Sequence, residues 1–166
     1  MTLKLDTILV PLDGSALAES ALPTAMDLAR CSGARLLLLR AAQAHRLLGV
    51  ESTDAQVRVI EEAEEYLRGV SERLATQGVS DAEPLVWYGG AAYAIIEAAR
   101  YRKVDLIVMT THGRSGLGRL IMGSVAESVL RGTATPILLI RPQQAPVVAP
   151  PVRELARPWS IAERPS

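Results

Sequence analysis

The chain has 166 residues, with 18 basic and 18 acidic side chains and a formal net charge of zero. This balance lacks the excess of positive charge with which proteins bind nucleic acids or acidic membrane surfaces. Hydrophobic residues make up 49% of the sequence, yet no apolar run reaches the roughly 18 residues that span a bilayer. Cys31 is the single cysteine, which excludes an internal disulfide, and the first residues show no secretory signal. We therefore expect a cytoplasmic protein.

Apolar runs rich in Leu, Ile and Val predict buried strands, and apolar residues recurring at steps of three and four predict helices between them. In chain order, the predicted elements are a strand at Thr7–Leu12, a helix at Ala16–Arg30, a strand at Arg35–Ala42, a helix at Asp54–Gln77, a strand at Glu83–Trp87, a helix at Ala92–Tyr101, a strand at Val104–Met109, a helix from Ser124 to about Arg131 and a strand at Ile137–Ile140.

Strands and helices alternate along this region, which is typical of an α/β fold with a mostly parallel sheet and right-handed crossovers. The continuous apolar run Leu36–Leu39 suits a strand covered on both faces. In such a sheet, ligands bind at the carboxyl ends of the strands, where the strand order reverses. If the strands at Thr7–Leu12 and Val104–Met109 are neighbours, the turn at Asp13 and the loop containing Gly113 face the same crevice.

The sequence divides into a predicted domain at residues 1–141 and a tail at residues 142–166. The tail contains six of the ten prolines and has no amphipathic pattern. We expect this tail to be extended or disordered. An arm docked on a partner subunit is the alternative.

The segment from Met109 to Glu127 follows a predicted strand and contains four glycines and two arginines. It leads into a helix whose start is predicted by the capping-box pattern Ser124-x-x-Glu127. A strand, a glycine-rich loop and a helix N-terminus together form a typical anion-binding arrangement, because the first backbone amides of a helix lack acceptors within it. The segment lacks the third glycine of the dinucleotide fingerprint and the lysine of a P-loop, so it matches neither motif.

The frame of Gly113, nine further residues and Gly123-Ser124 resembles the nucleotide-binding branch of the universal stress protein family. The opening Ile8–Ser15, Gly89 before the third helix and the last strand at Thr135–Ile140 resemble this family too, and the similarity spans roughly residues 5–141. The resemblance implies a doubly wound, five-stranded parallel sheet in the order 3-2-1-4-5 with helices on both faces, like that of the adenine nucleotide alpha hydrolases.

One position departs from the family's pattern. Thr110 stands where the first glycine of the motif is expected, and its side chain leaves less room for a close approach of the backbone.

The resemblance also implies a ligand, which is ATP or AMP, often with Mg²⁺, and the residues that bind it. Asp13 would lie near the ribose or a phosphate-bound metal, and no residue is expected to form a separate metal site. The pocket for adenine and sugar would be lined by Pro11, Leu12 and Ala41. The ribose and phosphates would contact Met109, Gly113 and Arg114, and the phosphates would be held by Gly123, Ser124 and Val125. Family members of this type pair as homodimers through the last strand, here Ile137–Ile140, and act in stress resistance or regulation.

Several of these residues also have a simpler interpretation. Asp13 is in a position to cap the first helix, Ser124 is expected to cap the last helix in either case, and Arg114 can be a solvated loop charge. His112 has no identifiable carboxylate partner, so we assign no catalytic residue. Two alternatives to a regulatory nucleotide-binding protein stay open: a slow ATPase on the same fold, and a nucleotide-free interaction module.

Overall fold

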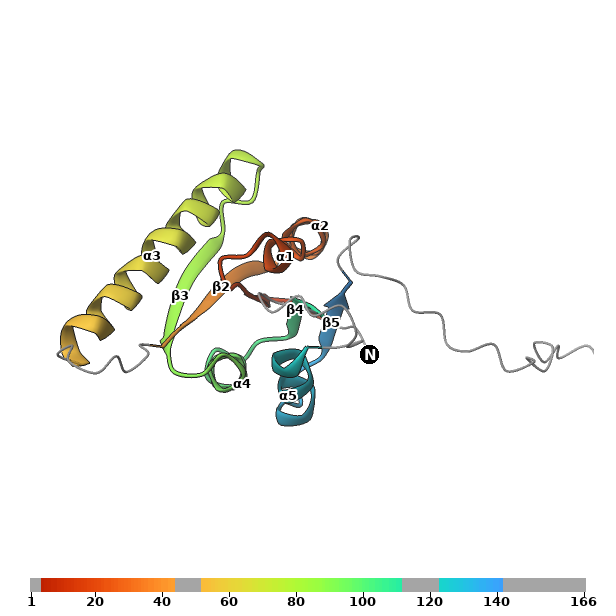
Figure 1. The fold of residues 1–166 in the computed structure, drawn as a ribbon. Coiled ribbons are helices and arrows are strands. Elements are labelled where there is room, and N and C mark those ends of the chain that lie inside the picture. The colour runs from red at the N-terminus through yellow and green to blue at the C-terminus, as the bar shows by residue number, and fades with distance from the viewer. Residues whose placement is uncertain (1–3, 44–51, 112–122, 142–166) are drawn as a thin grey trace, which may run out of the picture.

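A computed structural model of the chain describes residues 4–43, 52–111 and 123–141 (Figure 1). The predicted tail at residues 142–166 lies outside the described residues. In chain order, the elements are β1 (Thr7–Pro11), α1 (Ala16–Glu19), α2 (Leu22–Ser32), β2 (Arg35–Ala42), α3 (Ser52–Thr76), β3 (Ala82–Tyr88), α4 (Ala91–Tyr101), β4 (Leu106–Thr110), α5 (Ser124–Gly132) and β5 (Ile137–Ile140).

The strands form one parallel sheet in the order β3-β2-β1-β4-β5, which confirms the predicted α/β fold and its 3-2-1-4-5 order. The central strand β1 pairs with β2 through Ile8 and Leu36, and with β4 through Ile8 and Leu106. The predicted neighbourhood of the first and fourth strands is therefore correct. The strand order reverses at β1, so the crevice of this doubly wound sheet lies at the carboxyl ends of β1 and β4.

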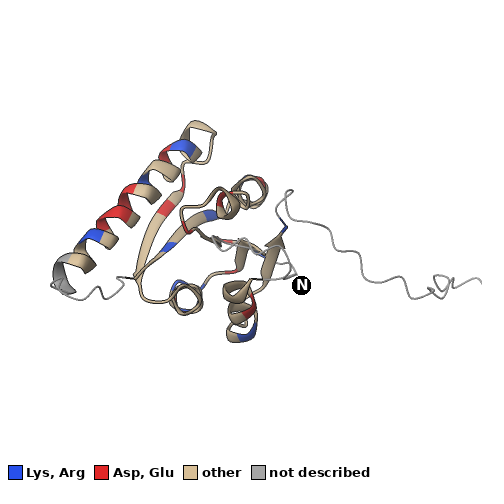
Figure 2. Ribbon diagram, in the orientation of Figure 1, with Lys and Arg blue, Asp and Glu red and all other residues tan. Residues whose placement is uncertain are grey.

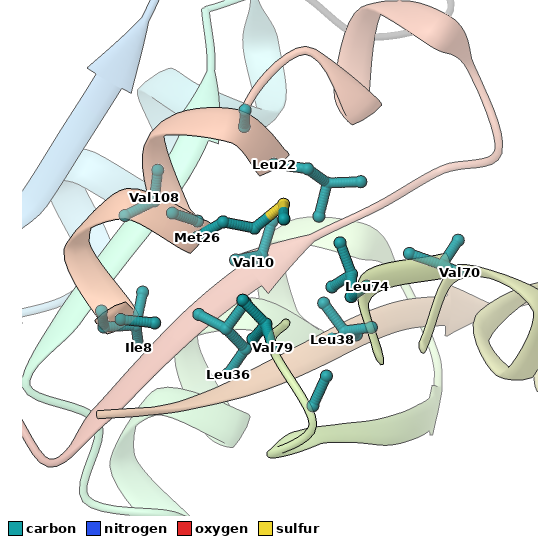
Figure 3. Close-up of a cluster of buried hydrophobic side chains, with 14 of the residues drawn as sticks. Ile8, Val10, Leu22, Met26, Leu36, Leu38, Val70, Leu74, Val79 and Val108 are labelled. Atoms are coloured by element: carbon teal, nitrogen blue, oxygen red, sulfur yellow. The ribbon is translucent and has the colours of Figure 1, made fainter. Parts of the chain in front are cut away.

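Each face of the sheet has its own apolar core, because successive residues of a strand point to opposite faces. Ile8 of β1 and Leu36 and Leu38 of β2 pack with α1, α2 and α3. Leu9 of β1 and Leu37 of β2 pack instead with α4 and α5. Figure 1 shows α4 and α5 on the opposite side of the sheet from α1, α2 and α3. In Figure 3, Met26 of α2 lies above Ile8, Leu36 and Leu38 of the first core.

The helix predicted at Ala16–Arg30 is wrong in one respect, since two helices occupy this region. The short α1 ends at Glu19, and α2 begins at Leu22. The Ser20 hydroxyl donates to the carbonyl of Leu17 at 2.6 Å. Pro23 stands in the first turn of α2, where the missing N–H costs no helical hydrogen bond but would interrupt a continuous helix.

Two glycines make a matched pair for testing the backbone account. Gly33 ends α2 with φ of 75°, a conformation that side-chain-bearing residues rarely adopt, whereas Gly69 lies inside α3; a Cβ on either would meet no atom within 4 Å. We predict that Gly33→Ala lowers the free energy of unfolding by about 1 kcal/mol, because it strains the backbone. Gly69→Ala should raise it by about 0.5–1 kcal/mol, because alanine favours helix.

Urea denaturation of the two variants and the parent protein measures both changes. Opposite signs support the helix end at Gly33 and the helical position of Gly69. A stabilising effect of Gly33→Ala would contradict the left-handed conformation at Gly33.

Candidate functional site

A cavity of about 520 Å³ lies at the carboxyl ends of β1, β2 and β4, at the point where the strand order reverses. Eight of the ten sequence-predicted site residues line it, from three strands, two turns and one helix. They are Pro11, Leu12, Asp13, Ala41, Met109, Gly123, Ser124 and Val125. The other two, Gly113 and Arg114, lie outside the described residues, as does His112. Segments more than 100 residues apart in the sequence thus meet around one hollow.

The turn after β1 is built by Asp13, Gly14 and Ser15. The Asp13 carboxylate accepts hydrogen bonds from the Ser15 amide at 2.9 Å and from the Ser15 hydroxyl at 2.6 Å. The Ser15 hydroxyl oxygen in turn accepts from the Ala18 amide at 3.1 Å and so caps α1. The interpretation of Asp13 as the helix cap is therefore wrong. Gly14 has φ of 84°, which lets the chain turn sharply and hold Asp13 at the cavity wall.

The N-terminus of α5 forms the opposite wall. Here the predicted capping box is wrong, because Gly123 is the cap residue and Ser124 is the first residue of the helix. Glu127 does not reach back to the cap; its carboxylate binds Arg131 at 2.7 Å, and its amide donates to the Gly123 carbonyl at 3.0 Å. The amides of Ser124 and Val125 precede this first helical bond, so they have no acceptor within the helix.

Gly123 itself ties α5 to β4. Its amide donates to the carbonyl of Thr111 at 2.6 Å, and the amide of Thr111 donates to the carbonyl of Ile140 at 3.0 Å. The Gly123 amide is therefore engaged within the chain, whereas no backbone acceptor among the described residues is found for the amides of Ser124 and Val125. This bond fixes the start of α5 at the carboxyl end of β4.

Between these walls, apolar side chains from the sheet and from α4 line part of the cavity. Met109 of β4 is buried and Ala41 of β2 is half-buried, while Leu39 and Ile95 come from the core between the sheet and α4. Thr110, the residue at the family's first glycine, is the last residue of β4; it is 7% exposed and also lines the cavity. Such a surface suits a flat, mostly apolar group such as a base or a sugar face.

Sequence analysis missed the wall formed by β2 and α3. Arg40 follows the leucines of β2, and its guanidinium lies 4.8 Å from the ring centroid of Tyr66 on α3. The Tyr66 hydroxyl donates to Glu19 at 2.8 Å, and Arg73 donates to the same carboxylate at 2.6 Å. Burial, followed by the hydrogen bond to Glu19, raises the pKa of Tyr66, so its hydroxyl stays protonated and continues to donate. In the sequence, the one indication of this wall is an arginine that follows the leucines of an apolar strand.

The charges around the cavity are few. Among its described lining residues, the ionisable side chains are Asp13, Arg40 and Glu62. Glu62 belongs to the acidic pairs of α3, which are exposed as expected and alternate with basic side chains along this helix in Figure 2. The described residues contain no cluster of three or more potential metal ligands from His, Cys, Asp and Glu. Nor does any helix among them have the length and apolar character needed to cross a membrane.

The arrangement combines an anion-attracting helix N-terminus, an apolar floor and a carboxylate held in a turn. It can bind a molecule that has a negatively charged end and a flat apolar body. The sequence and the overall fold of the chain, compared with those of known proteins, identify its family.

A Thermus aquaticus protein described as a universal stress protein is 36% identical over 136 residues, covering 81% of this chain and 98% of that protein. A crystal structure of a universal stress protein in complex with cAMP matches with a TM-score of 0.66 and 27% identity, covering 82% of this chain and 97% of that chain. An Arabidopsis thaliana family protein with AMP bound matches with a TM-score of 0.60 over 82% and 91% of the two chains. At 16% identity, this likeness shows the fold alone.

A sequence profile of the universal stress protein family matches residues 4–141, most of the chain and all of the described sheet. The profile, the Thermus relative and the shared fold agree with one another. This chain belongs to the universal stress protein family.

Proposed function

We propose that the cavity binds an adenine nucleotide, AMP or ATP, and that the protein acts in the cytoplasm as a homodimeric stress-response regulator. The observation that carries this proposal is the meeting of the β1 turn, the end of β4 and the N-terminus of α5 around one cavity. The cAMP complex of a 27% identical relative supports a nucleotide as the ligand class.

In this proposal, the phosphate end of the ligand lies at the N-terminus of α5. The amides of Ser124 and Val125 lack acceptors within this nine-residue helix, and the partial positive charge of its N-terminus favours an anion. The Ser124 side chain is exposed and adds a hydroxyl donor. Gly113 and Arg114, which precede the helix in sequence, stay predicted phosphate contacts.

The base and ribose are placed over Pro11, Leu12, Ala41 and Met109, where the wall is apolar. A volume of about 520 Å³ falls within the range of small-molecule sites. The carboxylate of Asp13 stands at the same cavity and offers hard oxygen ligands, so with ATP it can meet the ribose or a phosphate-bound Mg²⁺.

Regulation follows if a bound nucleotide favours one conformation of the chain over another. Thr111 and Gly123, the described residues on either side of residues 112–122, both line the cavity. A ligand shifts such an equilibrium only by the difference between its affinities for the two states. The nucleotide would thus change the surface that the homodimer presents to other proteins.

The first test is the identity of the bound molecule. We predict that the purified protein releases AMP or ATP on heating, identified by chromatography, because the site is built for both parts of a nucleotide. Calorimetry of the emptied protein should then detect AMP and, with magnesium, ATP. An empty site together with no binding of either nucleotide would contradict the proposal.

The second test places a side chain at the phosphate wall. Gly123 has φ of −71° and ψ of 154°, which valine can adopt, so Gly123→Val changes the cavity more than the backbone. We predict that it lowers AMP affinity more than about tenfold by occupying space at the phosphate position.

Gly90→Val is the matched control. Gly90 is also a helix cap, with φ of −66° and ψ of 144°; a Cβ there meets no atom within 4 Å, and Gly90 is not among the described residues that line the cavity. AMP affinity should stay close to that of the parent protein. Equal losses of AMP affinity in both variants would show that Gly123→Val disturbs the whole protein and does not act specifically at the phosphate position.

The third test concerns the homodimer. β5 is an edge strand of the sheet, and its four residues are only half-buried, so it can pair with a second copy. Light scattering should give twice the chain mass of 17.8 kDa. Leu138→Lys in β5 should shift the protein to monomer, whereas Val57→Lys on α3, at an exposed site, should not. A monomeric parent protein at all concentrations would contradict this pairing.

A further inference from the structure

Arg40 has unused hydrogen-bonding capacity at the cavity. It is the only basic side chain among the described residues that line it, and it is half-buried. Within the described part of the chain, its guanidinium makes no hydrogen bond or ion pair. An arginine carries five N–H donors in a fixed plane, so these donors are available to a ligand.

The structure also fixes where this guanidinium lies. It stacks on Tyr66, and its central carbon lies 3.7 Å from the position that a Cβ on Gly14 would take. Tyr66 is held by Glu19, whose carboxylate is held in turn by Arg73. Residues of β2, α3 and α1 therefore support one planar cation before any ligand arrives, which reduces the entropy lost on binding.

The position of Arg40 indicates which end of a nucleotide it meets. The N-terminus of α5 is fixed to the end of β4 by the Gly123–Thr111 hydrogen bond, whereas Arg40 lies on β2. β1 separates these two strands, so their backbones are two strand spacings, or about 10 Å, apart, and the Arg40 guanidinium lies beside Gly14 in the turn after β1. This distance is comparable to that between the phosphate and the base of a purine mononucleotide. With the phosphate at α5, the base reaches the wall of Arg40.

The same wall contains an acceptor. Glu62 on α3 also lines the cavity, and no ion pair joins its carboxylate to the Arg40 guanidinium. One edge of adenine presents the N7 acceptor beside the N6 amino donor, whereas guanine presents two acceptors, N7 and O6. A donor and an acceptor that line the same cavity match this edge of adenine, and the carboxylate repels the O6 of guanine.

We propose that Arg40 and Glu62 read the base of the nucleotide, Arg40 donating to a ring nitrogen and Glu62 accepting from the exocyclic amino group. This inference rests on the proposed function and adds base-reading residues to it. Tyr66 is a positioning residue in this proposal, because it contacts Arg40 and is not among the described residues that line the cavity.

The test compares three probes that carry different parts of AMP. The affinities of AMP, adenosine and ribose 5-phosphate are measured by calorimetry for the parent protein and for Arg40→Leu. We expect AMP and adenosine to weaken by the same factor, about tenfold or more, and ribose 5-phosphate to change less than about twofold. Arg100→Leu on α4, an exposed arginine outside the described cavity lining, should leave all three affinities unchanged.

Arg40→Gln keeps a polar side chain that is shorter and uncharged, so it also removes the guanidinium from the cavity and gives the same readout if the leucine variant does not fold. An AMP loss without an adenosine loss would place Arg40 at the phosphate and overturn the inference. Unchanged AMP affinity would overturn it as well, while leaving the nucleotide site intact. If the parent protein binds no AMP, both the inference and the proposed function fail.

Glu62→Gln tests the acceptor. A glutamine can both accept from adenine and donate to guanine, so the preference for AMP over GMP should fall by about tenfold. Glu61→Gln changes the adjacent exposed carboxylate, which is not among the described lining residues, and should leave the preference unchanged. An unchanged preference in Glu62→Gln would remove Glu62 from the site.

Discussion

The pairing of β1 with both β2 and β4 is the constraint on which the site depends. Ile8 lies beside Leu36 on one side and Leu106 on the other, so the chain leaves three neighbouring strands at the same edge of the sheet. The Asp13 turn, Arg40 and the start of α5 share one cavity only because of this order. Each face of β1 is buried by helices, which makes a shift of its register costly, since it would move every side chain to the opposite core.

Periodicity was sufficient to predict the strands, whereas their order was predicted from the resemblance to the family. The leucines at 36–39 are completely or almost completely buried, as a continuous apolar run in a central parallel strand predicts. Local boundaries were harder, because they depend on single hydrogen bonds. The break before α2 comes from Ser20 and Pro23, and the start of α5 comes from the bond between Gly123 and Thr111, where a serine pattern had predicted a different cap.

The lining of the cavity was predictable where a single segment of the chain forms one wall of it. The β1 turn and the first residues of α5 are of this kind, and the described members of the predicted set all line the cavity. The wall formed by β2 and α3, which contains Arg40, could not be predicted in this way. It needs Tyr66 from the next helix, and a sequence pattern contains no distance between a strand residue and a helix residue that follows 26 positions later. Its recognition required coordinates.

A crystal structure of the protein with AMP tests the central claim most directly. We predict that the phosphate of AMP lies about 3 Å from the amide nitrogens of Ser124 and Val125, and that the base extends across β1 toward Arg40. AMP bound with its phosphate away from the start of α5, or outside the cavity at the ends of β1 and β4, would contradict the account.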